Sequence, residues 1–172
     1  MNSKLDGIIL MGPFGSGKSY LGKRLFMKGI ARYTELEPIV YELFGKGDDL
    51  DIEEATKYIH THYYESLSSN SGLVAFESTG VVQRPLLLDV MAQFDVALVR
   101  VDTPKEICLA RVAKRNLGNP RPIELDNAAE FYDYWMTEIA PTYDFALTVD
   151  GTNEESATHS IRMLMEIERR IE

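Results

Sequence analysis

The residues Gly12-Pro13-Phe14-Gly15-Ser16-Gly17-Lys18-Ser19 decide the fold class of this 172-residue chain. They spell the pattern Gly, four residues, Gly-Lys-Ser, between an apolar run at 7–11 and a helix-like stretch at 20–27. Glycines let the backbone curl until several N–H groups converge on phosphates, and the following helix turns its positive end toward them. Lys18 adds a mobile charge for the β- and γ-phosphates, and the Ser19 hydroxyl is placed to ligate Mg²⁺. The pattern therefore predicts a nucleotide phosphate site.

Apolar runs of strand length alternate with segments of helical period along almost the whole chain. Alternation of this kind is typical of a parallel sheet, and strands that are apolar nearly throughout indicate helices on both faces. We expect an α/β fold with three layers, α/β/α, around a five-stranded parallel sheet. The chain shows no internal repeat or linker, which predicts a single domain over 1–172. The expected strands are 7–11, 31–36, 73–76, 96–101 and 146–149.

Capping signals place the ends of several helices. Thr103 and Glu106 form a capping box around Pro104, so a helix is expected from about Pro104, with Thr103 as its cap. The segment 116–127 is polar and breaks the alternation, as functional lids often do.

The charge balance limits the partners. The chain has 27 acidic and 18 basic side chains, a formal charge of −9, which argues against a wide nucleic-acid or membrane-binding face. No apolar run is long enough to cross a membrane, and the single cysteine, Cys108, favours a cytoplasmic location. We expect a monomer or homodimer whose anionic ligand is held locally.

A dinucleotide-binding oxidoreductase is one alternative, because Gly15-x-Gly17 is followed about 20 residues later by Glu35 and Glu37. The third glycine of that fingerprint would fall at Tyr20, and Lys18-Ser19 would have no purpose in it. The phosphate-loop interpretation is therefore favoured over binding of NAD(P).

Four further stretches carry a family resemblance: 37–45 (EPIVYELFG), 76–80 (FESTG), 111–115 (RVAKR) and 150–152 (DGT). With the glycine-rich loop, they make the chain similar to small P-loop kinases related to nucleoside monophosphate kinases, shikimate kinase and gluconate kinase. The resemblance implies a P-loop NTPase (adenylate kinase-like) fold with a lid at about 116–127 and an acceptor-binding helical segment at about 38–70. It also implies an ATP-dependent, Mg²⁺-requiring phosphotransferase acting on a hydroxyl or phosphate of a small soluble acceptor.

The resemblance carries residue roles with it. In such kinases an acid at the end of the second strand holds the acceptor hydroxyl; Glu37 matches it, with Glu35 two residues earlier on the same side of the expected strand. An arginine commonly follows three or four residues later. This chain has Val40 and Tyr41 there, which puts recognition of an acidic or phosphorylated acceptor at that point in doubt.

The remaining roles fall near the third strand and after the fourth. Glu77 is similar to the acid that orients Mg²⁺, although contact through water or an acceptor-side role stays open. Arg111 and Arg115 share one helix face, where the resemblance implies contact with the ATP phosphates. The predicted catalytic residues are Lys18, Glu37, Arg111 and Arg115. The predicted nucleotide site comprises Gly12, Phe14, Gly15, Ser16, Gly17, Lys18, Ser19, Tyr20, Arg111 and Thr152. The predicted acceptor site comprises Glu35, Glu37, Glu77, Arg84 and Arg121, and the predicted metal ligands are Ser19 and Glu77.

Two functional alternatives stay open beside the kinase. One is a nucleotide-binding module or slow NTPase without a small-molecule acceptor, which the missing arginine after Glu37 suggests. The NAD(P)-binding oxidoreductase is the other. A kinase acting on a nucleic-acid end is disfavoured by the net negative charge.

Overall fold

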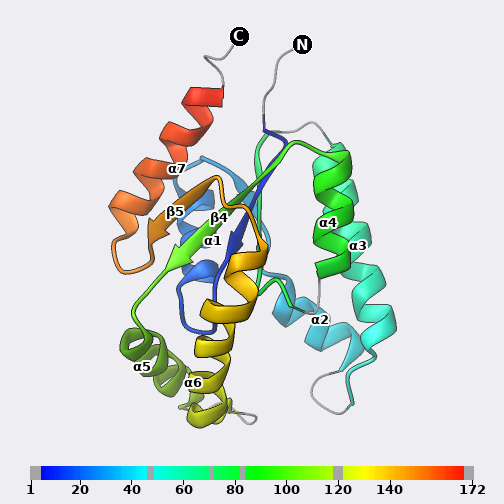
Figure 1. Ribbon diagram of the computed structural model, residues 1–172. Coiled ribbons are helices and arrows are strands. Elements are labelled where there is room, and N and C mark those ends of the chain that lie inside the picture. Colours follow the sequence, from blue (N-terminus) through cyan, green and yellow to red (C-terminus); the bar gives the residue numbers. More distant parts are fainter. Residues whose placement is uncertain (1–4, 46–48, 70–71, 82–83, 118–121, 169–172) are drawn as a thin grey trace.

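The computed structural model describes residues 5–45, 49–69, 72–81, 84–117 and 122–168. Five strands form one parallel sheet in the order β2-β3-β1-β4-β5 (Figure 1). The predicted five-stranded parallel sheet is therefore confirmed, and the carboxyl ends of its strands meet at one edge, where open α/β sheets bind ligands. The strands are β1 (Gly7–Met11), β2 (Arg32–Tyr33), β3 (Val74–Ser78), β4 (Val96–Asp102) and β5 (Leu147–Asp150).

Helices connect successive strands, as parallel pairing requires. No helix among the residues described is both long and apolar enough to span a membrane. The α-helices are α1 (Lys18–Met27), α2 (Leu36–Phe44), α3 (Ile52–Ser68), α4 (Arg84–Gln93), α5 (Lys105–Asn116), α6 (Leu125–Tyr134) and α7 (Glu154–Glu168). Helix α6 continues into a π-helical turn, η2 (Trp135–Ile139), and a 3₁₀ turn, η3 (Ala140–Thr142).

The central strand β1 is buried along its whole length because both faces of the sheet are covered. Ile8 and Leu10 pack on one face with side chains of α1 and α7. Ile9 and Met11 point the opposite way and pack with α3, α4 and η2. Figure 1 shows these layers, with α3 and α4 side by side and α7 on the other side of the sheet. The three-layer architecture is confirmed.

The π-helical turn holds the end of β3 in place. Trp135 is fully buried, and its Nε1 donates to the carbonyl oxygen of Thr79 at 2.8 Å. Tyr143 donates its hydroxyl to the carbonyl oxygen of Gly80 at 2.6 Å. These two bonds fix the turn that follows Glu77, at the ligand-binding edge of the sheet.

The second strand is shorter than predicted. We expected a strand over 31–36, but β2 covers only Arg32–Tyr33 and α2 already begins at Leu36. Pro38 explains the early helix, because a proline in the first turn lacks an N–H that would have no helical partner there. Glu37 consequently lies in the first turn of α2 and not at a strand end, and the expectation that Glu35 and Glu37 share one side of a strand is wrong.

The start of α5 is predicted correctly within a residue, but its cap is not. The N-cap residue is Pro104, without a side-chain bond, and the Thr103 hydroxyl donates instead to the Ser16 carbonyl oxygen. Farther on, residues 118–121 of the expected lid, including Arg121, lie outside the described residues. The described ends of that segment are tied together by a pair of bonds between the Asn116 amide and the backbone of Ile123, at 2.7 and 3.0 Å.

Candidate functional site

The loop between β1 and α1 closes tightly because two of its glycines adopt left-handed backbone angles. Gly15 has a φ of 76°, and Gly17, at the N-cap of α1, has a φ of 103°. A Cβ on Gly15 would lie only 2.3 Å from the carbonyl oxygen of Cys108. The loop therefore packs directly against α5, and the first backbone N–H groups of α1 are available to bind an anion.

The Lys18 ammonium lies among oxygens of the same loop. It donates to the carbonyl oxygens of Gly12 and Pro13 at 2.9 and 2.8 Å. Burial lowers the pKa of Lys18 to about 8, and the nearby Glu77 carboxylate acts against that shift. A phosphate at this position would favour the charged amine, since opposite charges stabilise each other most strongly where water is excluded.

A three-residue network stands beside Lys18, where α1 meets the end of β3. The Ser19 hydroxyl donates to Glu77 Oε2 at 2.7 Å, and the Tyr33 hydroxyl donates to Oε1 of the same carboxylate at 2.5 Å. Sheet register explains this approach: Tyr33 pairs with Ala75, two residues before Glu77, so both side chains leave the same face of the sheet. Burial and the adjacent Glu77 carboxylate raise the pKa of Tyr33, so its phenol remains a hydrogen-bond donor.

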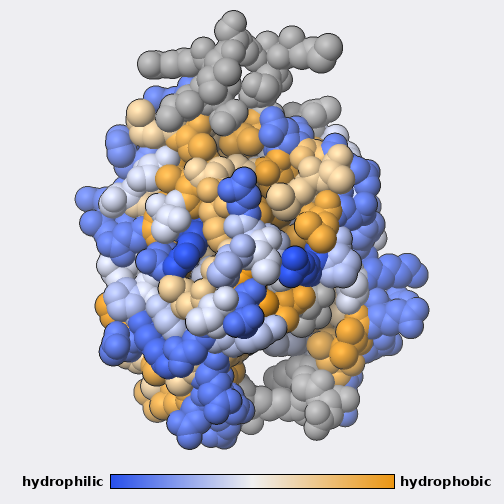
Figure 2. All heavy atoms as spheres, viewed as in Figure 1, coloured by the Kyte–Doolittle hydropathy of each residue, from blue (hydrophilic) through white to orange (hydrophobic). Residues whose placement is uncertain are grey.

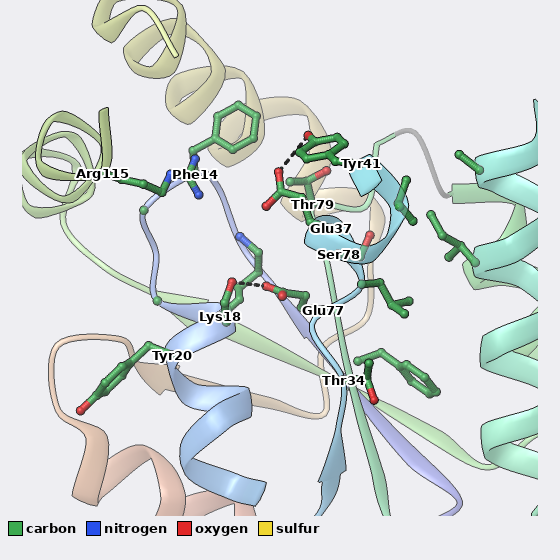
Figure 3. A pocket seen from close by; sticks show the side chains of 18 of the residues that line it. Phe14, Lys18, Tyr20, Thr34, Glu37, Tyr41, Glu77, Ser78, Thr79 and Arg115 are labelled. Atoms are coloured by element: carbon green, nitrogen blue, oxygen red, sulfur yellow. Dashed lines mark hydrogen bonds between the residues drawn. The ribbon is translucent and has the colours of Figure 1, made fainter. Parts of the chain in front are cut away.

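Two glutamates at the start of α2 face different partners. Glu37 Oε1 accepts a hydrogen bond from the Tyr41 hydroxyl, one helical turn later, at 3.0 Å. Burial, followed by the Glu37 carboxylate, raises the pKa of Tyr41 to about 12. Glu35 instead forms an ion pair with Lys23 on α1 at 2.7 Å. Figure 3 shows Glu37 and Tyr41 close to each other at the mouth of the site.

The two arginines of α5 differ in their contacts. Arg111 donates through Nη1 to the carbonyl oxygens of Gly15 and Ser16, at 3.1 and 3.2 Å, and through Nη2 to that of Gly151 at 3.0 Å. Arg115 is exposed, and no residue that the structure describes pairs with its guanidinium. Arg111 thus positions the loop, whereas Arg115 is free to bind an anionic ligand.

The loop before α7 is part of the same assembly. Gly151 approaches so closely that a Cβ there would lie 2.0 Å from Thr103 Oγ1 and 2.4 Å from the Ser16 carbonyl oxygen. Thr103, almost fully buried, donates to that carbonyl oxygen at 2.8 Å. Loops from the ends of β4 and β5 are thereby held in contact with the glycine-rich loop at the end of β1.

These elements enclose one cavity of about 550 Å³. The molecular surface is hollowed between the α5–α6 end and the α2 end, as Figure 2 shows. On its loop side, the cavity is lined by Phe14, Gly15, Gly17, Lys18, Ser19, Tyr20, Arg111, Val112 and Arg115. Its α2–α3 side comprises Thr34, Leu36, Glu37, Val40, Tyr41, Leu50, Ile52, Ala55, Thr56, Ile59 and Tyr63, and the end of β3 adds Phe76, Glu77, Ser78 and Thr79.

Most of the predicted site residues meet in this cavity, and a few lie elsewhere. Gly12 and Ser16 are buried within the loop, and Lys18 contacts both of them. Tyr20 lies at the margin, directed away from Lys18 in Figure 3, and its hydroxyl bonds to Glu154 at 2.6 Å.

Two further predicted residues, Arg84 and Thr152, do not line the cavity. Arg84 is the first residue of α4, and its guanidinium lies 5.5 Å from the ring centre of Tyr143. Thr152 bonds to Asp150 through both its backbone N–H and its hydroxyl. The residue that caps α7 is Asn153, whose side chain accepts from the N–H of Ser156.

Sequence reasoning missed Tyr33, Tyr41 and Thr103 as contributors to the site. A tyrosine in a strand is typical of a sheet core, and only the register between β2 and β3 brings Tyr33 to Glu77. Tyr41 could have been found from its i,i+4 spacing to Glu37 had the helix been placed at Leu36.

Comparisons with known proteins agree with this geometry, although no family model matches the chain. The shikimate kinase of Geobacter sulfurreducens is 24% identical over 168 residues, covering 81% of this chain and 93% of that protein. The crystal structure of shikimate kinase from Bacteroides thetaiotaomicron has a TM-score of 0.65 at 18% identity, covering 93% and 98% of the two chains. Deoxyadenosine kinase from M. mycoides, solved with dATP, has a TM-score of 0.60 at 16% identity, covering 93% and 99%.

The structural matches establish the fold, and the curated relative matches along most of both chains. Together with the glycine-rich loop between β1 and α1, these similarities support a small-molecule P-loop kinase.

Proposed function

We propose that this enzyme transfers the γ-phosphoryl group of ATP to a hydroxyl of a small acceptor bound on the α2–α3 side of the cavity. The observation that carries the proposal is the shared cavity itself, which has Lys18 and Ser19 on one side and the Glu37 carboxylate on the other. Two reactants bound in one enclosed space can be aligned for direct transfer, and such alignment accounts for much of phosphoryl-transfer catalysis.

Mg²⁺ fits the oxygen atoms between Ser19 and Glu77. Ser19 Oγ and Glu77 Oε2 are 2.7 Å apart, next to the first turn of α1. The described part of the chain contains no cluster of three or more His, Cys, Asp or Glu side chains that could form a metal cage. This pair suits an ion that takes few protein ligands and completes its shell with water and nucleotide phosphate, as Mg²⁺ does. When bound, the ion would neutralise charge on the phosphates.

In this proposal Glu37 acts as the base. Its Oε1 is held by Tyr41, which leaves the second oxygen to accept the proton of the acceptor hydroxyl. As that hydroxyl oxygen forms a bond to the γ-phosphorus, the bond from this phosphorus to the β–γ bridging oxygen breaks, and ADP leaves with the electron pair.

Cations on the loop side stabilise the negative charge of the phosphoryl group during its transfer. Lys18 would exchange its loop carbonyl partners for phosphate oxygens, and the unpaired Arg115 would reach the γ-phosphoryl group from α5. Arg111 acts as a positioning residue, because its donors already hold the loop. We further propose a cytoplasmic location, which the single buried thiol of Cys108 supports.

The test is an ADP-release screen over sugars, sugar acids, nucleosides, nucleotides and shikimate-like acids. We expect at least one acceptor to raise ADP release well above the acceptor-free rate, and Lys18→Ala to abolish the increase while the protein stays folded. Glu37→Gln should lower acceptor-dependent turnover far more than Glu35→Gln does. Glu42→Gln, on an exposed position of the same helix outside the cavity, is the matched control. ADP release that no acceptor accelerates would instead favour a slow NTPase.

A further inference from the structure

The cations of the cavity are confined to its loop side. Among the described lining residues, the positive side chains are Lys18, Arg111 and Arg115. The α2–α3 side contributes the Glu37 carboxylate, and Glu77 follows at the end of β3. Among the described residues, the α2–α3 side of the cavity therefore carries a negative charge and no positive one.

The loop-side cations are committed to the loop and to the nucleotide. The Lys18 ammonium donates to two loop carbonyl oxygens, and Arg111 donates to three backbone carbonyl oxygens, including that of Gly151. Arg115 lines the same side of the cavity, and the proposed function assigns it to the γ-phosphoryl group. Under that assignment, none of these three cations remains for an anion on the α2–α3 side.

Other described arginines that could serve an anionic acceptor are engaged outside the cavity. Arg84 lies over the ring of Tyr143, and Arg32 donates to the carbonyl oxygen of Ser66 at 2.7 Å. Val40 and Tyr41 line the wall one turn after Glu37. In the part of the chain that the structure describes, the wall beside Glu37 is thus formed by apolar or neutral groups.

The α2–α3 side offers apolar contact in place of charge. Val40 is 5% exposed, Ile59 lines the same wall, and the ring of Tyr63 stacks on Phe76 with centroids 3.9 Å apart and planes 14° apart. Burial here would stabilise an apolar body, whereas a second carboxylate or phosphate beside Glu37 would meet like charge.

We propose that the acceptor is an uncharged alcohol with an aromatic or aliphatic face, and not a carboxylate or a phosphate ester. The inference rests on the proposed function, since it assigns the substrate class of the same site. Discrimination comes both from the apolar wall, which favours the neutral partner, and from the Glu37 carboxylate, which repels the anion.

Acceptor pairs in which one member carries an anionic group and the other is neutral test the proposal. Adenosine is compared with AMP, glucose with gluconate, and the methyl ester of shikimate with shikimate, each by kcat/KM for acceptor-dependent ADP release. We expect the neutral member to be preferred by about tenfold or more in every pair that reacts, the effect of an uncompensated charge in a partly desolvated site. Among neutral acceptors, adenosine and methyl shikimate should exceed glucose, whose C–H face is smaller and bordered by hydroxyl groups.

A positive charge introduced at position 41 provides a second test of the proposal. Tyr41 is 40% exposed, so Tyr41→Arg places a guanidinium at the cavity wall without disturbing the core. It should raise the anionic member's kcat/KM relative to the neutral one by about tenfold. Tyr41→Gln, which also removes the phenol but adds no charge, should leave that ratio near the wild-type value. Circular dichroism confirms that both variants fold.

The outcomes separate this inference from the proposed function. A tenfold preference for the anionic member in the wild-type enzyme, or an unchanged ratio in Tyr41→Arg, overturns the neutral-acceptor assignment and leaves the kinase intact. If no acceptor of either charge raises ADP release, the proposed function falls and this inference falls with it.

Discussion

Removing the hydroxyl of Tyr33 should weaken the response of the enzyme to Mg²⁺ while leaving the fold in place. In Tyr33→Phe, Glu77 Oε1 loses the donor that now lies 2.5 Å away, while the Ser19 bond to Oε2 remains. A hydrogen bond to a charged group contributes about 1.5–3 kcal/mol. Loss of a group that orients a metal-binding carboxylate typically costs about tenfold to a hundredfold in metal affinity, and we expect an effect of that size.

The assay is a Mg²⁺ titration of ATP turnover at saturating ATP, with isothermal titration calorimetry of ATP binding with and without Mg²⁺. Tyr63→Phe is the matched control, because the Tyr63 hydroxyl donates to the Glu77 backbone carbonyl oxygen at 3.3 Å and not to its carboxylate. The control should lose about 0.5–1.5 kcal/mol of stability and keep its Mg²⁺ dependence. A Mg²⁺ half-saturation in Tyr33→Phe equal to that of the control would refute the assignment of Glu77 as a metal ligand oriented by Tyr33.

Three further outcomes are expected. ATP affinity should weaken by up to about tenfold per pH unit above the Lys18 pKa of about 8. Without nucleotide, the free energy of unfolding should rise between about pH 8 and pH 10.5, because the unfolded chain binds more protons than the folded one there. An ATP affinity that does not change up to about pH 10 would contradict this. Gly15→Ala should abolish ATP binding and cost about 1–3 kcal/mol of stability in chemical denaturation, because the φ of Gly15 is 76° and a Cβ would meet the Cys108 carbonyl oxygen. The control, Gly29→Ala, should retain ATP binding, because Gly29 has a φ of 63° but open space around it. Trp135→Ala should cost about 3–5 kcal/mol in the same measurement, and a loss below 1 kcal/mol would show that Trp135 does not anchor the end of β3.

The parts of the fold with strong local signals were predictable. Residues 7–19 combine a buried strand, two glycines in left-handed conformations and a helix start, and each of these leaves a mark in the sequence. Strand β1 alternates between two cores, so its continuous apolar run correctly predicts helices on both faces.

Features that depend on tertiary contacts were not predictable. Residues 31–36 have the composition of a strand, yet the helix that starts at Leu36 cuts the strand to two residues and turns Glu35 and Glu37 toward different partners. Thr103 has the position of a helix cap, but the approach of the Ser16 carbonyl oxygen gives its hydroxyl a better partner. No local pattern can reveal a bond between residues 87 positions apart.

Most of the residues predicted for the site line one cavity, because they follow strand ends that parallel pairing gathers at one edge of the sheet. The residues that hold the carboxylates of the site in position were not predicted. The donors that orient Glu77 and Glu37 are Tyr33 and Tyr41, whose places depend on strand register and on where α2 begins. Arg111 was expected to bind ATP phosphates, yet its contacts with the Gly15, Ser16 and Gly151 carbonyls show a residue that also shapes the loop.

The most direct test of the account follows a radiolabelled γ-phosphoryl group from ATP in the presence of Mg²⁺ and a neutral alcohol acceptor such as adenosine. Transfer of the label to the acceptor by the wild-type enzyme and by Glu42→Gln, with loss of transfer in Lys18→Ala and a large reduction in Glu37→Gln, is the predicted result. Label that appears only as inorganic phosphate, at a rate that no acceptor changes, would contradict it.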